Sequence, residues 1–181
     1  MKVIKTSLPG VLVLEPEIFR DERGLFYESY SKKKFDDALQ LNINFVQDNI
    51  SESSSNVLRG LHYQIKNPQA KLVQVISGEI FDVAVDLRIS SATFGKWFGV
   101  NLSSNNKRQL WIPEGFAHGF YTISNKVIFS YKVTNFYSPN DERCILWNDK
   151  NLNIDWPIKN TPNVSLKDKQ GKFLYDSELY N

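Results

Sequence analysis

The stretch KLVQVISGEIFDVAVDL, Lys71 to Leu87, has the pattern of two β-strands joined by a tight turn. Leu72–Ser77 and Ile80–Leu87 are rich in β-branched residues, and the Ser-Gly-Glu between them is typical of a turn. In the second run, side chains alternate between two faces: Phe81, Val83 and Val85 on one, and Asp82, Ala84 and Asp86 on the other. We expect the two aspartates on a solvated face. The alternative is an inward position, which would mark a cavity inside a barrel.

Similar runs continue on the C-terminal side, separated by Gly, Asn, Ser or Pro. They are Lys96–Leu102, Arg108–Ile112, Gly119–Ile123 and Val127–Val133. Many short strands at regular spacing favour a β-sandwich or barrel over alternating strands and helices. A short peripheral helix is predicted over Ser31–Leu41 with Ser31 as N-cap, and the tail from Asn148 predicts loops and one short helix.

Composition limits the functions that fit the chain. Its 181 residues show no repeat and no linker, so residues 1–181 are predicted to form one domain. The net charge of +2 does not indicate a nucleic-acid or membrane surface, and no apolar run approaches the roughly 20 residues of a transmembrane helix. The single cysteine, Cys144, excludes an internal disulfide and favours the cytoplasm. As a small buried residue it needs no chemical role.

Metal and nucleophile chemistry both have weak support in the sequence. There are two histidines, His62 and His118, with no His-x-His and no adjacent carboxylate, so no metal site is predicted, although two histidines and a distant carboxylate remain an alternative. No Gly-x-Ser-x-Gly elbow, P-loop or dinucleotide fingerprint is present. General acid–base chemistry by histidine, tyrosine and carboxylates remains.

His62, in VLRGLHYQ, is the candidate base because imidazole titrates near neutral pH. It needs an acceptor on its second ring nitrogen to fix the tautomer. Arg59 and Lys71 flank it in sequence. They suit phosphate recognition and stabilisation of a developing oxyanion, with plain surface charges as the equal alternative.

Three further side chains can serve either a site or the core. His118, in WIPEGFAHGF, is predicted in a tight apolar loop, where backbone hydrogen bonds would satisfy it as well as a ligand would. Tyr131 is predicted on a strand and Tyr137 at its end. A tyrosine hydroxyl can donate a proton and its ring can stack on a base, but packing is the commoner use.

Taken together, the motifs closely resemble one enzyme family. FRDERGLFYESY, FVQDN, VLRGLHYQ, QAKLVQVISGEIFDVAVDLR, FGKW, NKRQLWIPEGFAHGF, YKVTNFYSP and WND…IDWP occur in this order. The chain resembles the dTDP-4-dehydrorhamnose 3,5-epimerases from about Met1 to Asp168. The resemblance implies a mostly β, cupin-like jelly-roll barrel of antiparallel strands with a few short peripheral helices. It also implies no metal, no cofactor, a homodimer, and inversion of C3 and C5 of a dTDP-4-keto-6-deoxy sugar.

The resemblance also assigns roles to individual residues. It implies that His62 is the base, Asp168 its carboxylate partner and Tyr131 the proton donor on the opposite face of the sugar. It implies that Lys71 and His118 line the sugar and its keto group, and that Tyr137 stacks on thymine. Nucleotide or sugar contacts are implied for Arg23, Glu28, Gln47, Asp48, Asn49, Arg59, Glu142 and Lys167.

Two alternatives stay open at this stage. One is a sibling enzyme of the same fold, such as a 3-epimerase, a 5-epimerase or a ketoisomerase. The other is a non-catalytic barrel that binds a sugar or nucleotide, which would need neither Tyr131 opposite His62 nor Asp168 behind it.

Overall fold

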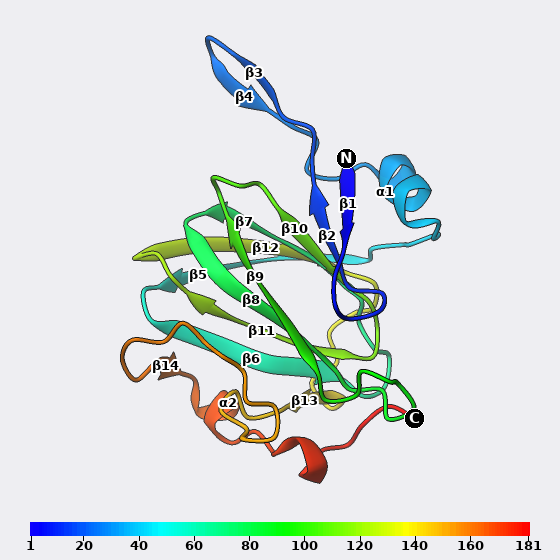
Figure 1. Ribbon diagram of the computed structural model, residues 1–181, viewed down its shortest axis with the longest axis vertical. Helices are drawn as coiled ribbons and strands as arrows, with labels where there is room; N and C mark the ends of the chain where they lie inside the picture. The colour runs from blue at the N-terminus through cyan, green and yellow to red at the C-terminus, as the bar shows by residue number, and fades with distance from the viewer.

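Two six-stranded β-sheets lie face to face in the computed structural model, which describes residues 1–181 (Figure 1). The first sheet has the order β1 (Lys2–Lys5), β2 (Leu12–Glu15), β10 (Gln109–Ile112), β7 (Lys71–Ser77), β12 (Lys126–Val133) and β5 (Gln47–Ser54). The second has the order β13 (Glu142–Cys144), β6 (Val57–Gln64), β11 (Phe116–Thr122), β8 (Glu79–Asp86) and β9 (Trp97–Ser103), with β14 (Asn163–Val164) parallel to β6. All other neighbouring strands are antiparallel, so the predicted mostly β, cupin-like architecture is confirmed.

The main core fills the space between the two sheets. Fourteen buried residues form it, including Val73 on β7, Ala84 on β8 and Phe129 on β12. A second cluster covers the outer face of the β6–β11–β8 sheet beneath the C-terminal segments, where Val83 and Trp156 lie. Because both faces of the second sheet are covered, its strands carry few solvated positions.

The two strands predicted within Lys71–Leu87 are confirmed, but the prediction that Asp82 and Asp86 lie on a solvated face is wrong. β7 and β8 occupy the two runs, and Gly78 in the turn has φ +88° with a hypothetical Cβ only 2.4 Å from a backbone oxygen, which explains the glycine. Asp82 and Asp86, however, are fully buried. Asp82 faces His118, and Asp86 is neutralised by Arg88 at 2.7 Å, so their burial rests on specific partners.

The loop predicted around His118 is also wrong. β11 begins at Phe116, three residues before the predicted run, so His118 lies inside a strand whose seven residues are all buried. The apolar character of WIPEGFAHGF comes from burial on both faces of the sheet, which a short run cannot distinguish from an apolar loop.

The helices are short and peripheral, as predicted. α1 (Lys32–Leu39) begins after Ser31, whose side chain makes no capping hydrogen bond, and packs Phe35 against Trp111 on the outside of the first sheet. The tail contains α2 (Leu166–Lys169) and a 3-10 turn at Leu174–Asp176. None of the helices has the length and apolar character needed to cross a bilayer.

A separate hairpin, β3 (Phe19–Asp21) and β4 (Gly24–Phe26), extends away from the rest of the chain (Figure 1). All six of its strand residues are exposed, including Phe19 at 51% and Phe26 at 65%. The sequence analysis did not identify this hairpin.

Candidate active site

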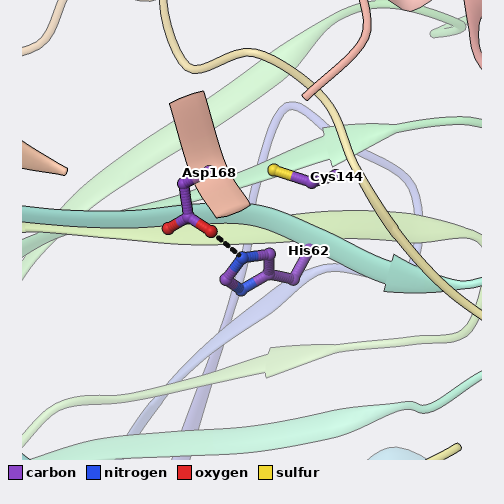
Figure 2. A group of neighbouring side chains, drawn as sticks. All are labelled: His62, Cys144 and Asp168. Carbon is purple, nitrogen blue, oxygen red and sulfur yellow. Dashed lines mark hydrogen bonds and ion pairs between the residues drawn. The ribbon is translucent and has the colours of Figure 1, made fainter. Parts of the chain in front are cut away.

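The centre of the site is a hydrogen bond between His62 and Asp168, which lie far apart in sequence. His62 Nε2 is 2.7 Å from Asp168 Oδ1, as Figure 2 shows. His62 lies on β6 with its side chain 29% exposed, whereas the Asp168 carboxylate is 4% exposed. The carboxylate acceptor that a histidine base requires is therefore present, but it comes from α2 rather than from a neighbouring residue.

Local structure holds the Asp168 carboxylate in place. Ser165 caps α2 by accepting a hydrogen bond from the Asp168 backbone N–H at 3.1 Å, and the Gly60 N–H donates to Asp168 Oδ2 at 3.0 Å. Burial alone would raise the pKa of Asp168, but the hydrogen bonds from His62 and Gly60 outweigh it and hold the pKa below its usual value. The carboxylate therefore stays ionised and orients the imidazole.

Close contact between β6 and β11 places the two histidines side by side. His62 and His118 are register partners, and a Cβ on Gly60 would lie 2.6 Å from the Gly119 backbone. Gly60 also has φ +111°, a conformation that favours glycine. The close contact between the two strands thus requires a glycine at position 60, two residues before His62.

His62 opens into a cavity of about 250 Å³ between the two sheets. Its lining combines predicted site residues with apolar side chains: Ser51, Arg59, His62, Lys71, His118, Gly119, Phe120, Phe129, Tyr131, Tyr137 and Glu142. An adjoining hollow of about 90 Å³ shares His62, Lys71, Tyr131, Tyr137 and Glu142. The pair of hollows offers room for an extended ligand.

Lys71 and His118 are two buried titratable groups in this cavity, and burial lowers the pKa of both. Burial lowers the pKa of Lys71 to about 8, with the Glu142 and Asp82 charges opposing the shift. Burial also lowers the pKa of His118, against the attraction of Asp82, whose carboxylate lies 2.9 Å from His118 Nε2. Lys71 therefore carries a positive charge at neutral pH that it loses as the pH rises above about 8. His118 is a neutral imidazole held by the Asp82 carboxylate.

Tyr131 enters the cavity from the sheet opposite His62, because β12 belongs to the first sheet and β6 to the second. Burial raises its pKa, so the hydroxyl remains protonated at neutral pH. A histidine and a tyrosine on facing sheets can act on opposite faces of a ligand held between them.

The mouth of the cavity carries a small polar network. The Tyr137 hydroxyl donates to Glu142 at 2.6 Å, Lys167 pairs with the same carboxylate, and the Tyr137 N–H donates to Gln47 at 3.2 Å. Gln47 Nε2 in turn donates to Asn49 at 2.8 Å, and Asn49 is the register partner of Tyr131. This places Gln47, Asn49, Tyr137, Glu142 and Lys167 at one end of the site.

Three predicted contact residues belong neither to the cavity lining nor to the polar network at its mouth. Asp48 points to the other side of β5 and pairs with Lys132 at 2.8 Å. Arg23 lies at the hairpin turn with its side chain 84% exposed, paired with Asp21, and Glu28 pairs with Lys34 near α1.

Several residues that the sequence analysis did not select belong to the site. Asp82, whose inward position was only the alternative to a solvated face, is the partner of His118. Ser51 carries the one buried side-chain polar atom that lacks a hydrogen-bond partner, and it lines the cavity. Phe129 stacks on His118 with ring centroids 6.0 Å apart.

A barrel of two facing sheets with a carboxylate-oriented histidine at its cavity is typical of an enzyme that uses general acid–base catalysis. The sequence model of one such family, dTDP-4-dehydrorhamnose 3,5-epimerase, matches residues 5–176. Because the match covers nearly the whole chain, the chain belongs to this family and is a sugar epimerase, an isomerase.

Individual relatives agree with this assignment. A dTDP-4-dehydrorhamnose 3,5-epimerase from Shigella flexneri is 56% identical over 99% of both chains. A crystal structure of the Legionella pneumophila dTDP-6-deoxy-D-glucose-3,5-epimerase in complex with dTDP-4-keto-L-rhamnose has a TM-score of 0.97 at 48% identity, covering 99% of this chain and 97% of that one. A 3'-monoepimerase from Streptomyces bikiniensis, solved with dTDP-quinovose, has a TM-score of 0.89 at 30% identity, covering 94% and 86%.

Proposed function

We propose that the chain inverts C3 and C5 of dTDP-4-dehydro-6-deoxy-D-glucose to give dTDP-4-dehydro-L-rhamnose, with His62 as the base. The observation that supports this most directly is the His62–Asp168 hydrogen bond at the wall of the cavity. The carboxylate fixes the imidazole tautomer, so that the other ring nitrogen can accept a proton from a carbon next to the keto group.

Proton removal requires stabilisation of the enolate oxygen as negative charge develops. Lys71, on β7 of the first sheet, supplies the positive charge, and His118, held by Asp82, lines the cavity from the second sheet. The keto group already makes the neighbouring protons acidic, so this chemistry needs no cofactor. Tyr131 then returns a proton from the opposite sheet, which gives inversion because base and acid approach different faces of the sugar.

The nucleotide half of the substrate holds the sugar in position. Arg59 lines the cavity and suits a pyrophosphate, and the exposed ring of Tyr137 suits stacking on thymine. Gln47, Asn49, Glu142 and Lys167 surround this end of the site and complete its polar contacts. Binding energy from this distant group orients the reacting carbons.

Arg23, Glu28 and Asp48 lie away from the cavity of their own chain, so they could contact substrate only in a second copy of the chain. We therefore propose that the protein is a homodimer. The hairpin that carries Arg23 stands away from its own barrel and exposes Phe19, Leu25 and Phe26 (Figure 1). Apolar side chains on a projecting hairpin are typical of an interface. A second copy would cover them and bring Arg23 to its cavity. We place this homodimer in the cytoplasm, where the single thiol stays reduced.

Solvent deuterium incorporation tests the function directly. We expect wild-type protein in heavy water to introduce deuterium at both C3 and C5 of the 4-keto sugar and to yield the L-rhamno configuration, as read by NMR and mass spectrometry. His62→Ala should incorporate neither label. Incorporation at C3 alone would identify a monoepimerase, like the Streptomyces bikiniensis relative, and no incorporation by wild type would refute the proposal.

A further inference from the structure

We infer that His62, Asp168 and Cys144 together form an inhibitory site for zinc or another thiophilic divalent cation. One nitrogen, one oxygen and one sulfur ligand atom of these residues lie within 4.8 Å of one another. Figure 2 shows the thiol, the imidazole and the carboxylate side by side. Nothing in the acid–base mechanism uses Cys144, so the thiol is available for a second role.

The backbone fixes all three positions. Cys144 on β13 is the register partner of His62 on β6, and Asp168 is held by the Ser165 cap and by the Gly60 N–H. A cation would therefore meet ligands that are already gathered, without rearrangement of the strands. Such preorganisation lowers the cost of binding.

The separations suit a tetrahedral ion after small side-chain rotations. With bonds of about 2.0–2.3 Å, ligand atoms around zinc lie about 3.3–3.8 Å apart. The widest separation of 4.8 Å must shrink by about 1 Å, and the 2.7 Å contact between His62 and Asp168 must open by somewhat less. Small rotations about the χ angles of His62, Asp168 and Cys144 can produce both changes.

The ligand chemistry selects a soft or borderline ion. Zinc accepts thiolate, imidazole and carboxylate together, and three protein ligands with an open fourth position are a common zinc arrangement. His62, Asp168 and Cys144 supply these three ligands. Magnesium and calcium prefer oxygen ligands alone, so this site discriminates against them.

Proton release accompanies binding. The Cys144 thiol has only a weak hydrogen bond, to the Ile145 carbonyl at 3.6 Å, so no strong partner holds its proton. Zinc replaces the thiol proton, which passes to solvent, and the thiolate and carboxylate then neutralise the charge of the ion. Binding therefore strengthens as pH rises.

Occupancy stops catalysis if His62 is the base of the proposed function. Whichever ring nitrogen binds zinc, the other carries the single proton of a neutral imidazole, so no lone pair remains to accept a substrate proton. Zinc binding itself does not depend on the proposed function, which lets the two be tested separately.

The test compares wild type with Cys144→Ser and Cys144→Ala, with folding of each checked by thermal unfolding in chelator. Zinc binding is measured by competition with a chromophoric chelator, and epimerase activity is measured in zinc buffers and in magnesium. We expect wild type to bind one zinc per chain, to lose activity at the same free zinc concentration, and to recover fully with chelator. Both variants should keep wild-type activity without zinc and bind zinc at least about 10-fold more weakly; magnesium should have no effect.

Equal zinc affinity in wild type and both variants would overturn the site, as would an absence of binding to wild type. Zinc bound through Cys144 without loss of activity would overturn the inhibition. Failure of the proposed function has a different signature, because wild type in chelator would then introduce no deuterium into the 4-keto sugar.

Discussion

We expect His62 and Asp168 to contribute unequally to proton removal, because the imidazole faces the cavity and the carboxylate lies behind it. We expect His62→Ala to lower kcat by about 10²–10⁴-fold, the usual contribution of a general base. Asp168→Ala should cost less, since His62 can still accept a proton in its less favoured tautomer. Steady-state kinetics measures both, with thermal unfolding as control because Asp168→Ala also leaves the Gly60 N–H without its acceptor. Wild-type turnover in His62→Ala would disprove the base assignment.

We expect Lys71 to set an alkaline limit on activity. Its pKa of about 8 means that the ammonium carries its charge below pH 8 and loses it as the pH rises through that value. If this charge stabilises the enolate, kcat/KM, which reports on the unliganded enzyme, should fall on the alkaline side near pH 8. Lys71→Gln should lower kcat by about 10²–10³-fold.

Lys71→Arg is the matched control for that pH profile. A guanidinium keeps its charge throughout the range, so the decline near pH 8 should disappear from whatever activity remains. An unchanged alkaline limb in Lys71→Arg would assign the titration to a different group.

Tyr131 should matter for returning a proton and not for removing one. Tyr131→Phe removes the hydroxyl and keeps the ring that packs near Phe129, so binding should survive. His62 and Lys71 would still form the enolate, and we expect substantial deuterium exchange with loss of most net inversion, at C5 especially. NMR and mass spectrometry of the sugar measure both quantities. Equal loss of exchange and inversion would place Tyr131 in enolisation or substrate placement instead.

At the scale of elements, the site depends on how closely β6 approaches β11. Gly60→Ala would place a methyl group 2.6 Å from the Gly119 Cα and 2.7 Å from the His118 oxygen, both backbone atoms that cannot move aside. Because this collision adds to the strain of a φ of +111°, we expect Gly60→Ala to lower the free energy of unfolding by at least about 3 kcal/mol. Activity should fall as well, because the change lies two residues from His62.

Gly10→Ala is the control that introduces backbone strain without a collision between the new methyl group and another strand. Gly10 has a similar φ of +93°, but its added Cβ would meet only a Pro113 ring atom at 3.2 Å. We expect a loss of about 1–2 kcal/mol there and no change in kcat. Urea unfolding at one fixed protein concentration measures both variants; equal losses would show that strand contact contributes nothing.

At the scale of the whole molecule, the proposed dimer predicts complementation between two defective chains. Arg23→Ala should raise KM by removing a substrate contact, and His62→Ala should remove turnover. If Arg23 serves the cavity of the second copy, a mixed dimer contains one site with both residues intact. Co-expressed, differently tagged chains purified as mixed dimers should therefore regain activity at low substrate concentration. No gain over the separate variants would place Arg23 outside the site.

The fold class and several of the local elements follow from the sequence. Alternation in Lys71–Leu87, regularly spaced turns and the helical spacing of Phe35 and Leu39 are local signals, and β7, β8 and α1 formed within one or two residues of their predicted runs. Motif spacing carried the resemblance to an epimerase family, which the comparisons confirm.

The tertiary structure alone brought the chemistry together. Asp168 reaches His62 across 106 residues and Asp82 reaches His118 across 36, and no local pattern encodes such contacts. A period-two pattern reports which side chains share a face, but not whether the other face is covered, so Asp82 and Asp86 were expected in solvent and are buried. Burial, in turn, sets the pKa of Lys71, and the pairing of β13 with β6 places Cys144 beside His62. Charge, orientation and proximity depend on groups distant in the chain, which is why only the folded molecule determines them.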